Sequence, residues 1–115
     1  MLIGQTVIAK TSPGTVLYGP WFPRQGNKFT AIVQVIRVSG ISGTVNFRLD
    51  VETKNREASD ASPTALGNGN RTGAGMLEVA NTGALELIRY KFTITGNSGV
   101  EWVHFRSNPP LWLRN

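Results

Sequence analysis

The chain has 115 residues, carries 12 Lys and Arg against 7 Asp and Glu, and contains one histidine and no cysteine. The missing cysteines exclude disulfide scaffolds, thiolate zinc sites, iron–sulfur clusters and cysteine nucleophiles, and the single histidine argues against most histidine-based metal sites. With 40% apolar and 17% charged residues, the composition predicts one folded domain with one core. The net charge of +5 is compatible with nucleic acid, an anionic glycan or an acidic protein, but the cations are spread along the chain and select none of them.

Apolar and polar residues alternate with a period of two along most of the chain, between turns rich in Gly, Pro, Asn and Ser. This pattern is typical of β-strands with one face buried and one in water. We therefore expect an all-β fold, an antiparallel β-sandwich of jelly-roll-like type with seven or eight strands, and a small closed barrel is the alternative. The expected strands are residues 3–9, 15–18, 28–38, 44–53, 76–80, 88–95 and 100–106.

Two pairs of successive strands are expected to form hairpins. Residues 44–53 alternate strictly, and pairing them with 28–38 about a Gly-rich turn places Phe47 opposite Val35. The apolar faces of the two strands then match, whereas a one-residue slip would bring core residues opposite polar ones.

The second expected hairpin joins residues 88–95 to 100–106 and places Phe92 opposite Val103. Its outward face would then combine cations with one tryptophan, and Arg89 would lie directly opposite Arg106. Such a face suits a subunit contact, which we favour, or single-stranded nucleic acid, although one aromatic residue is fewer than such sheets usually present. The residues of this predicted face are Arg89, Lys91, Trp102, His104 and Arg106.

Two segments do not resemble strands. Residues 54–75 are polar and rich in Gly and Asn, and they predict a long loop that is functional or that orders on a partner. Residues 107–115 contain a Pro-Pro pair followed by an apolar triplet, which predicts an extended arm after a sandwich domain of residues 1–106. Such an arm must either pack back on its own domain or dock on a neighbour, and because exposed apolar residues favour association, we expect it to dock on a neighbouring subunit. Its expected contact residues are Pro110, Leu111, Trp112 and Leu113.

A third feature is the aromatic segment that contains Tyr18, Trp21 and Phe22. These side chains predict either a plug for one end of the sandwich or an exposed platform on which a sugar ring stacks. The sequence leaves both interpretations open.

Candidate catalytic groups are few. Asp50 and Glu52 share the outer face of one expected strand, about 7 Å apart by strand geometry. Paired carboxylates occur in glycosidases, but alternating strands produce such pairs by default, so a solvated strand face is the better interpretation. His104 has no apparent partner for catalysis. We expect no enzymatic activity, no cofactor and no metal site.

Three short segments carry a family resemblance: residues 18–24 (YGPWFPR), 51–55 (VETKN) and 102–106 (WVHFR), followed by a Pro-Pro pair and Trp112. In these segments the chain resembles the small all-β accessory proteins of tailed-bacteriophage particles, such as head-decoration proteins. The resemblance implies a β-sandwich that assembles symmetrically, binds a capsid or tail surface and catalyses nothing. Many such proteins clasp their neighbours with an N-terminal arm, whereas here only the C-terminal segment fits that pattern.

Together these observations predict a non-enzymatic structural protein that forms a homo-oligomer in a virion or a similar shell, with a larger capsid or tail protein as a further partner. A carbohydrate-binding β-sandwich module is the first alternative, and a single-stranded nucleic-acid-binding protein is the second. The first residues do not resemble a signal peptide, and no stretch is apolar enough for a membrane helix, so we expect synthesis in the cytoplasm and no membrane association.

Overall fold

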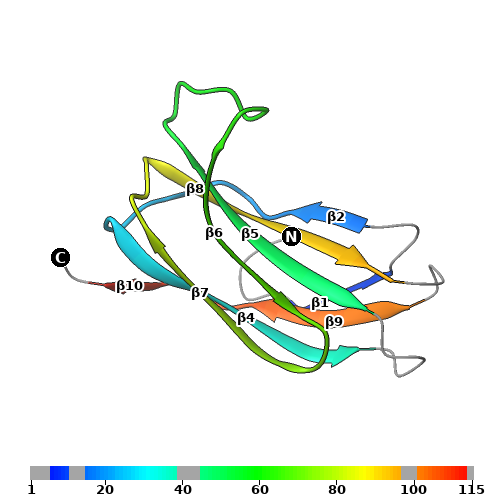
Figure 1. Cartoon of the computed structure of the whole chain (residues 1–115). Coiled ribbons are helices and arrows are strands. Elements are labelled where there is room, and N and C mark those ends of the chain that lie inside the picture. Colours follow the sequence, from blue (N-terminus) through cyan, green and yellow to red (C-terminus); the bar gives the residue numbers. More distant parts are fainter. Residues whose placement is uncertain (1–5, 11–14, 39–44, 97–100, 114–115) are drawn as a thin grey trace.

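The computed structural model describes residues 6–10, 15–38, 45–96 and 101–113, and the regular secondary structure of these residues is entirely β-strand. Their ten strands form two sheets in which all neighbouring strands run antiparallel (Figure 1). The predicted antiparallel β-sandwich is confirmed, and two separate sheets replace the closed barrel of the alternative. The strands are β1 (Thr6–Lys10), β2 (Thr15–Tyr18), β3 (Phe22–Pro23), β4 (Lys28–Val38), β5 (Asn46–Lys54), β6 (Thr64–Arg71), β7 (Gly75–Thr82), β8 (Leu87–Thr95), β9 (Trp102–Ser107) and β10 (Leu111–Leu113).

The strand order is that of a jelly roll. Sheet A runs β1, β9, β4, β7, and the short β10 continues the line of β9 along the same side of β4. Sheet B runs β2, β8, β5, β6, and the two-residue β3 continues the line of β2 along β8. The chain therefore crosses between the sheets at most of its connections, which interleaves the two sheets as in other jelly rolls.

This order overturns both predicted hairpins. β4 lies in sheet A and β5 in sheet B, so Val35 pairs with Phe105 and Gly75, whereas Phe47 pairs with Ile94 and Arg71. β8 and β9 are likewise separated between the sheets. Seven of the ten described strands lie where strands were predicted, whereas β3, β6 and β10 were not expected, and residues 3–5, 44 and 100 of the expected strands lie outside the described residues. Matching apolar faces could not show which strands pair. Two strands that face each other across a core match in the same way as two strands that lie side by side.

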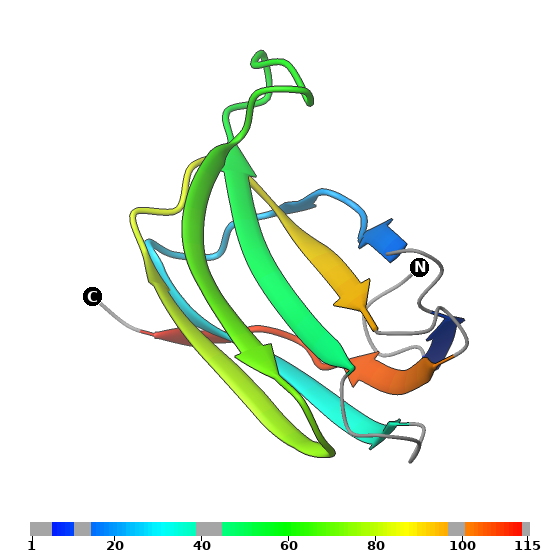
Figure 2. The same cartoon turned by 45° about the vertical axis from the view of Figure 1, so that its right-hand side comes forward.

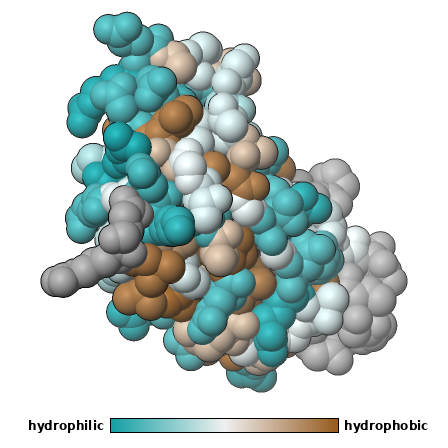
Figure 3. Space-filling model, turned by 60° about the vertical axis from the view of Figure 1, so that its left-hand side comes forward, coloured by the Kyte–Doolittle hydropathy of each residue, from teal (hydrophilic) through white to brown (hydrophobic). Residues whose placement is uncertain are grey.

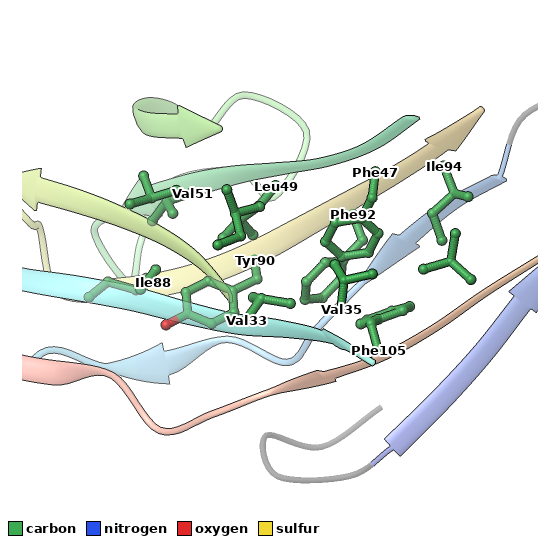
Figure 4. Close-up of a cluster of buried hydrophobic side chains, with 14 of the residues drawn as sticks. Val33, Val35, Phe47, Leu49, Val51, Ile88, Tyr90, Phe92, Ile94 and Phe105 are labelled. Carbon is green, nitrogen blue, oxygen red and sulfur yellow. The ribbon is translucent and has the colours of Figure 1, made fainter. Parts of the chain in front are cut away.

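The core fills the space between the sheets with the inward-facing side chains of both (Figure 4). Phe47 and Phe92 of sheet B stack against Phe105 of sheet A, with ring centroids 4.8 and 4.9 Å from that of Phe105. Tyr90 lies beside them with its ring edge-on to Phe22 and Phe92, and its hydroxyl has no hydrogen-bond partner among the described residues. Apolar burial on this scale is the main stabilising term for a chain of this size.

The predicted loop of residues 54–75 is wrong in its second half, because residues 64–71 form β6. Gly67 and Gly69 bring β6 close to β7: a Cβ on Gly67 would lie 2.7 Å from both Asn81 Oδ1 and Val79 Cγ1. The buried Asn81 side chain accepts a hydrogen bond from the Gly67 backbone N–H at 2.9 Å. Glycine in this strand therefore serves close packing, and Figure 2 shows β6 and β7 side by side at one edge of the sandwich. The loop that remains is residues 55–63.

The predicted extended arm also needs correction. The Asn108 N–H donates a hydrogen bond to the Ile32 carbonyl at 2.9 Å, and β10 then pairs with β4 of the same chain. Trp112 faces inward and packs on Phe29 with their ring centroids 4.9 Å apart. The aromatic ring that was expected to dock on a neighbour thus covers this chain's own core, because Phe29 offers an apolar surface within reach of the Pro-Pro turn. Residues 114–115 lie outside the described residues.

Candidate functional site

The predicted cationic face is divided between the two sheets. Arg89 and Lys91 project from β8 on the outer face of sheet B, whereas Trp102, His104 and Arg106 project from β9 on the outer face of sheet A. The expected opposition of Arg89 and Arg106 is therefore wrong. Arg89 instead pairs in register with Glu52 on β5, so a carboxylate occupies the place next to it.

Arg89 is the centre of a cluster on the outer face of sheet B. Its Nη2 donates a hydrogen bond to Glu52 Oε1 at 2.7 Å, and its guanidinium carbon lies 4.2 Å from the ring centroid of Tyr18 and 4.4 Å from that of Trp21. Two aromatic rings and a carboxylate thus satisfy one cation, an arrangement that attracts through both charge and ring quadrupole. We refer to Tyr18, Trp21, Glu52 and Arg89 as the Arg89 cluster.

Lys54 joins this cluster to the loop of residues 55–63. Its ammonium donates hydrogen bonds to the Ala58 carbonyl and to the carboxylate of Asp60, and it lies 5.0 Å from the ring centroid of Trp21. The Lys54 side chain is buried, so these contacts replace its lost water. The hydrogen bond from Lys54 holds the pKa of Asp60 below its usual value. The loop is thereby attached to the sheet at a fixed place.

The aromatic segment has one side chain packed on the core and one largely exposed. Phe22 packs edge-on against the buried Tyr90 at a centroid distance of 5.6 Å and so closes that part of the core. Tyr18 points away from the core and keeps 49% of its surface exposed. Trp21 lies between these extremes, and its indole N–H is buried without a hydrogen-bond partner in the described structure. Within the segment, Tyr18 has the surface that an external molecule could reach.

Beside the Arg89 cluster, mostly polar side chains form two rows across β2, β8, β5 and β6 of sheet B. The first row runs Tyr18, Lys91, Asp50, Asn68 from β2 through β8 and β5 to β6, as the strand registers show. The second row consists of Val16, Thr93, Arg48 and Asn70 in the same strand order. Neighbouring strands lie about 4.8 Å apart, so the side chains of one row are close enough to contact a single elongated ligand.

The two rows are joined by an ion pair. Arg48 Nε lies 3.0 Å from Asp50 Oδ2, and a further hydrogen bond joins Arg48 Nη2 to Asp50 Oδ1 at 3.1 Å. The hydrogen bond to Asp50 is the main reason that the pKa of Arg48 is raised above its ordinary value. Asp50 and Glu52 are therefore the partners of Arg48 and Arg89, and each of the two carboxylates has its own cation.

The outer face of sheet A has a different character. On β9, the Trp102 ring lies 5.8 Å from the guanidinium carbon of Arg37, His104 is half-buried and Arg106 is exposed. Leu111 and Leu113 of β10 point outward with 56% and 46% of their surface exposed. Sheet A thus presents apolar side chains to solvent, whereas most outward side chains of sheet B are polar.

Several residues of sheet B were not singled out from the sequence as site residues. Asp50 and Glu52 were considered only as a catalytic pair on one outer strand face, and the contact of Glu52 with Arg89 depends on the pairing of β5 with β8. Asn68 and Asn70 were assigned to a loop, although the alternation of residues 67–70 (GNGN) is a strand signal with glycine facing inward and asparagine outward.

Among the residues that the structure describes, no three His, Asp or Glu side chains are placed to hold a metal ion together. The same residues include no helix that is long and apolar enough to span a membrane. Comparison of the chain with models of known protein families and with curated proteins found no match in either set.

Proposed function

We propose that this protein is a non-enzymatic structural protein whose copies associate through the outer face of sheet A, as part of a virion or a similar shell. The observation that carries the proposal is the exposure of Leu111 and Leu113. β10 is attached to β4 by its own pairing and by Trp112, so both leucines are held facing solvent. Apolar side chains fixed in this way lose their contact with water when a second copy covers them.

Further apolar side chains lie on the same face. Ile36 of β4 and Met76 of β7 are exposed, so four of the six large hydrophobic side chains that are exposed in the described structure belong to this face. Figure 3 shows hydrophobic surface gathered around the C-terminal end of the described chain. Methionine, tryptophan and arginine are residue types that are enriched at protein interfaces, and this face has all three. They are Met76, Trp102, Arg37 and Arg106.

The face also carries charges of both signs, which suits contact between identical copies. Glu78 of β7 is exposed close to β4, and Lys28, Arg37 and Arg106 are exposed on β4 and β9. In a twofold contact the same face of both copies is buried. A face with charges of both signs can then place its acidic side chain against a basic side chain of the other copy. This contact stacks sheet faces and replaces the docking of an extended C-terminal arm that we expected from the sequence.

The assignment to a virion rests on the family resemblance, with a capsid or tail protein as the larger partner. The second alternative, binding of single-stranded nucleic acid, finds less support. The predicted cations lie on two opposite faces, and Arg89 already has a carboxylate partner. A continuous basic groove with stacked aromatics is the usual feature of such binding, and the division of the cations removes it.

The test is the native mass of the purified chain by size-exclusion chromatography with light scattering, across a range of concentrations. We expect an oligomer for the natural sequence and a shift toward the single chain for the double variant Leu111→Ser and Leu113→Ser. The matched control is Val16→Ser, which removes an exposed hydrophobic side chain from sheet B and is expected to leave the mass unchanged. A natural sequence that stays a single chain at all concentrations, or an oligomer that both variants leave intact, would overturn the proposal.

A further inference from the structure

The outer face of sheet B has the features of a ligand-binding surface that is separate from the face proposed for self-association. Its first row places Tyr18, Lys91, Asp50 and Asn68 on four successive strands. The row starts with an aromatic ring and continues with an ammonium donor, a carboxylate acceptor and an amide that both donates and accepts. Because these side chains stand on a paired sheet, their spacing is set by the strands and does not depend on a mobile loop.

Tyr18 is held in place by its neighbours. The guanidinium of Arg89 lies 4.2 Å from the ring centroid, and the ammonium of Lys91 lies 6.0 Å away. About half of the Tyr18 side chain remains exposed even though these cations are close to it. An aromatic ring that is fixed and partly exposed loses little conformational freedom when a ligand stacks on it. The apolar C–H face of a sugar ring suits such a surface, and the sugar hydroxyls suit its polar neighbours.

The charges of this face favour a neutral ligand over an anionic one. Arg48 is paired with Asp50, Arg89 with Glu52, and Lys54 with Asp60. A phosphate or sulfate group would have to displace these carboxylates to reach these three cations, which leaves Lys91 as the described cation of the face that is not in an ion pair, although the whole chain has a net charge of +5. A neutral polyhydroxylated ligand needs no such displacement, since its hydroxyls can donate to carboxylates and accept from ammonium and amide groups at the same time.

We propose that the outer face of sheet B binds a neutral oligosaccharide, with one sugar ring stacked on Tyr18 and with hydroxyls of the following rings bonded by Lys91, Asp50 and Asn68. Arg48 and Asn70 of the second row border the same path and widen it. Tyr18 is fixed in this place by the guanidinium of Arg89. The proposal does not depend on the proposed function, because the two faces lie on opposite sides of the sandwich.

The experiment is an NMR titration of the isotope-labelled chain with four neutral hexasaccharides, namely cellohexaose, maltohexaose, mannohexaose and chitohexaose, and with a heparin-derived hexasaccharide as the anionic comparison. We expect saturable shift changes for at least one neutral sugar, confined to β2, β5, β6 and β8. Tyr18→Ala should weaken that binding about tenfold, the upper range for a single aromatic contact. Tyr18→Phe should retain the affinity, because it keeps the stacking ring.

Two further variants separate the site from general effects on folding. Asn68 is exposed and lies at the other end of the row from Tyr18. We expect Asn68→Ala to weaken binding severalfold. Trp102→Ala removes an aromatic side chain from the outer face of sheet A and should leave binding unchanged. The Leu111→Ser and Leu113→Ser variant should also bind normally. The proposal is overturned if no neutral hexasaccharide binds, if only the heparin fragment binds and salt abolishes it, or if Tyr18→Ala binds as tightly as the natural sequence.

Discussion

Glu52 and Arg89 stand side by side on β5 and β8, with 2.7 Å between Glu52 Oε1 and Arg89 Nη2. Both side chains are largely buried, with 17% and 13% of their surface exposed. Tyr18 and Trp21 cover the guanidinium, so water cannot easily replace the carboxylate if it is removed. The pair therefore belongs to the interior of the cluster, although it lies on the outer face of a sheet.

Glu52→Ala should lower the free energy of unfolding by about 2 kcal/mol, because it leaves a mostly buried cation without its partner. Urea denaturation at neutral pH measures the change. The control is Arg56→Ala, which breaks an exposed pair with Glu86 at 3.8 Å, keeps the hydrogen bond from its own backbone N–H to Glu86 and should cost less than about 0.5 kcal/mol. Equal effects of the two substitutions would contradict the buried role of the Glu52 and Arg89 pair.

Gly67→Ala should destabilise the fold by about 2 kcal/mol through overpacking between β6 and β7. The added Cβ would lie 2.9 Å from the backbone oxygen of Ala80, which cannot move away without disturbing β7. Gly73→Ala is the matched control, because a Cβ at that position would meet nothing within 4 Å. Thermal or urea unfolding compares the two variants. If Gly67→Ala were as stable as Gly73→Ala, the close approach of the two strands would be wrong.

Tyr90→Phe should leave the stability at pH 7 unchanged or raise it by up to about 1 kcal/mol, since it removes a buried hydroxyl that has no hydrogen-bond partner in the described structure. Burial also raises the pKa of the Tyr90 hydroxyl above its usual value near 10. The folded chain favours the neutral hydroxyl. The free energy of unfolding of the natural protein therefore does not depend on this group below the unfolded pKa and falls as the pH rises above it.

Unfolding measurements from pH 7 to pH 11 test this pH dependence. Above pH 10 the natural sequence should lose stability faster than Tyr90→Phe, and the other titrating groups cancel because both proteins contain them. A variant that is clearly less stable at pH 7 would show that the hydroxyl has a partner after all.

Asp60→Asn should lower the melting temperature at pH 7, because it removes the carboxylate that accepts a hydrogen bond from the buried Lys54. The pKa of Asp60 is lowered in the folded chain, so its contribution is present above the unfolded pKa near 4 and is lost as the pH falls through the folded value. The difference between the two proteins should therefore disappear toward pH 2. Glu57→Gln, an exposed change in the same loop, is the control. Identical melting temperatures at pH 7 would argue against this attachment of the loop.

The amino-acid sequence by itself determined the strands and their buried faces. The alternation around Phe47, Phe92 and Phe105 identified side chains that the structure buries completely. Where this signal failed, in residues 64–71, Gly67 and Gly69 occupied inward positions, so the strand had few of the apolar side chains by which strands are recognised. Similarly, the apolar triplet after Pro110 was recognised, but whether Trp112 would cover its own core or another chain was not.

Only the tertiary structure decided which strands are neighbours and therefore which side chains share an outer face. It placed Arg89 beside Glu52 and Tyr18 and separated it from Trp102 and Arg106, so the candidate ligand-binding face could not be assembled from the sequence. The physical reason is that the hydrophobic effect has no direction. It specifies that a side chain leaves water but not which strand lies beside its own, and the pairing follows only when all connections and both layers of the sandwich are satisfied together.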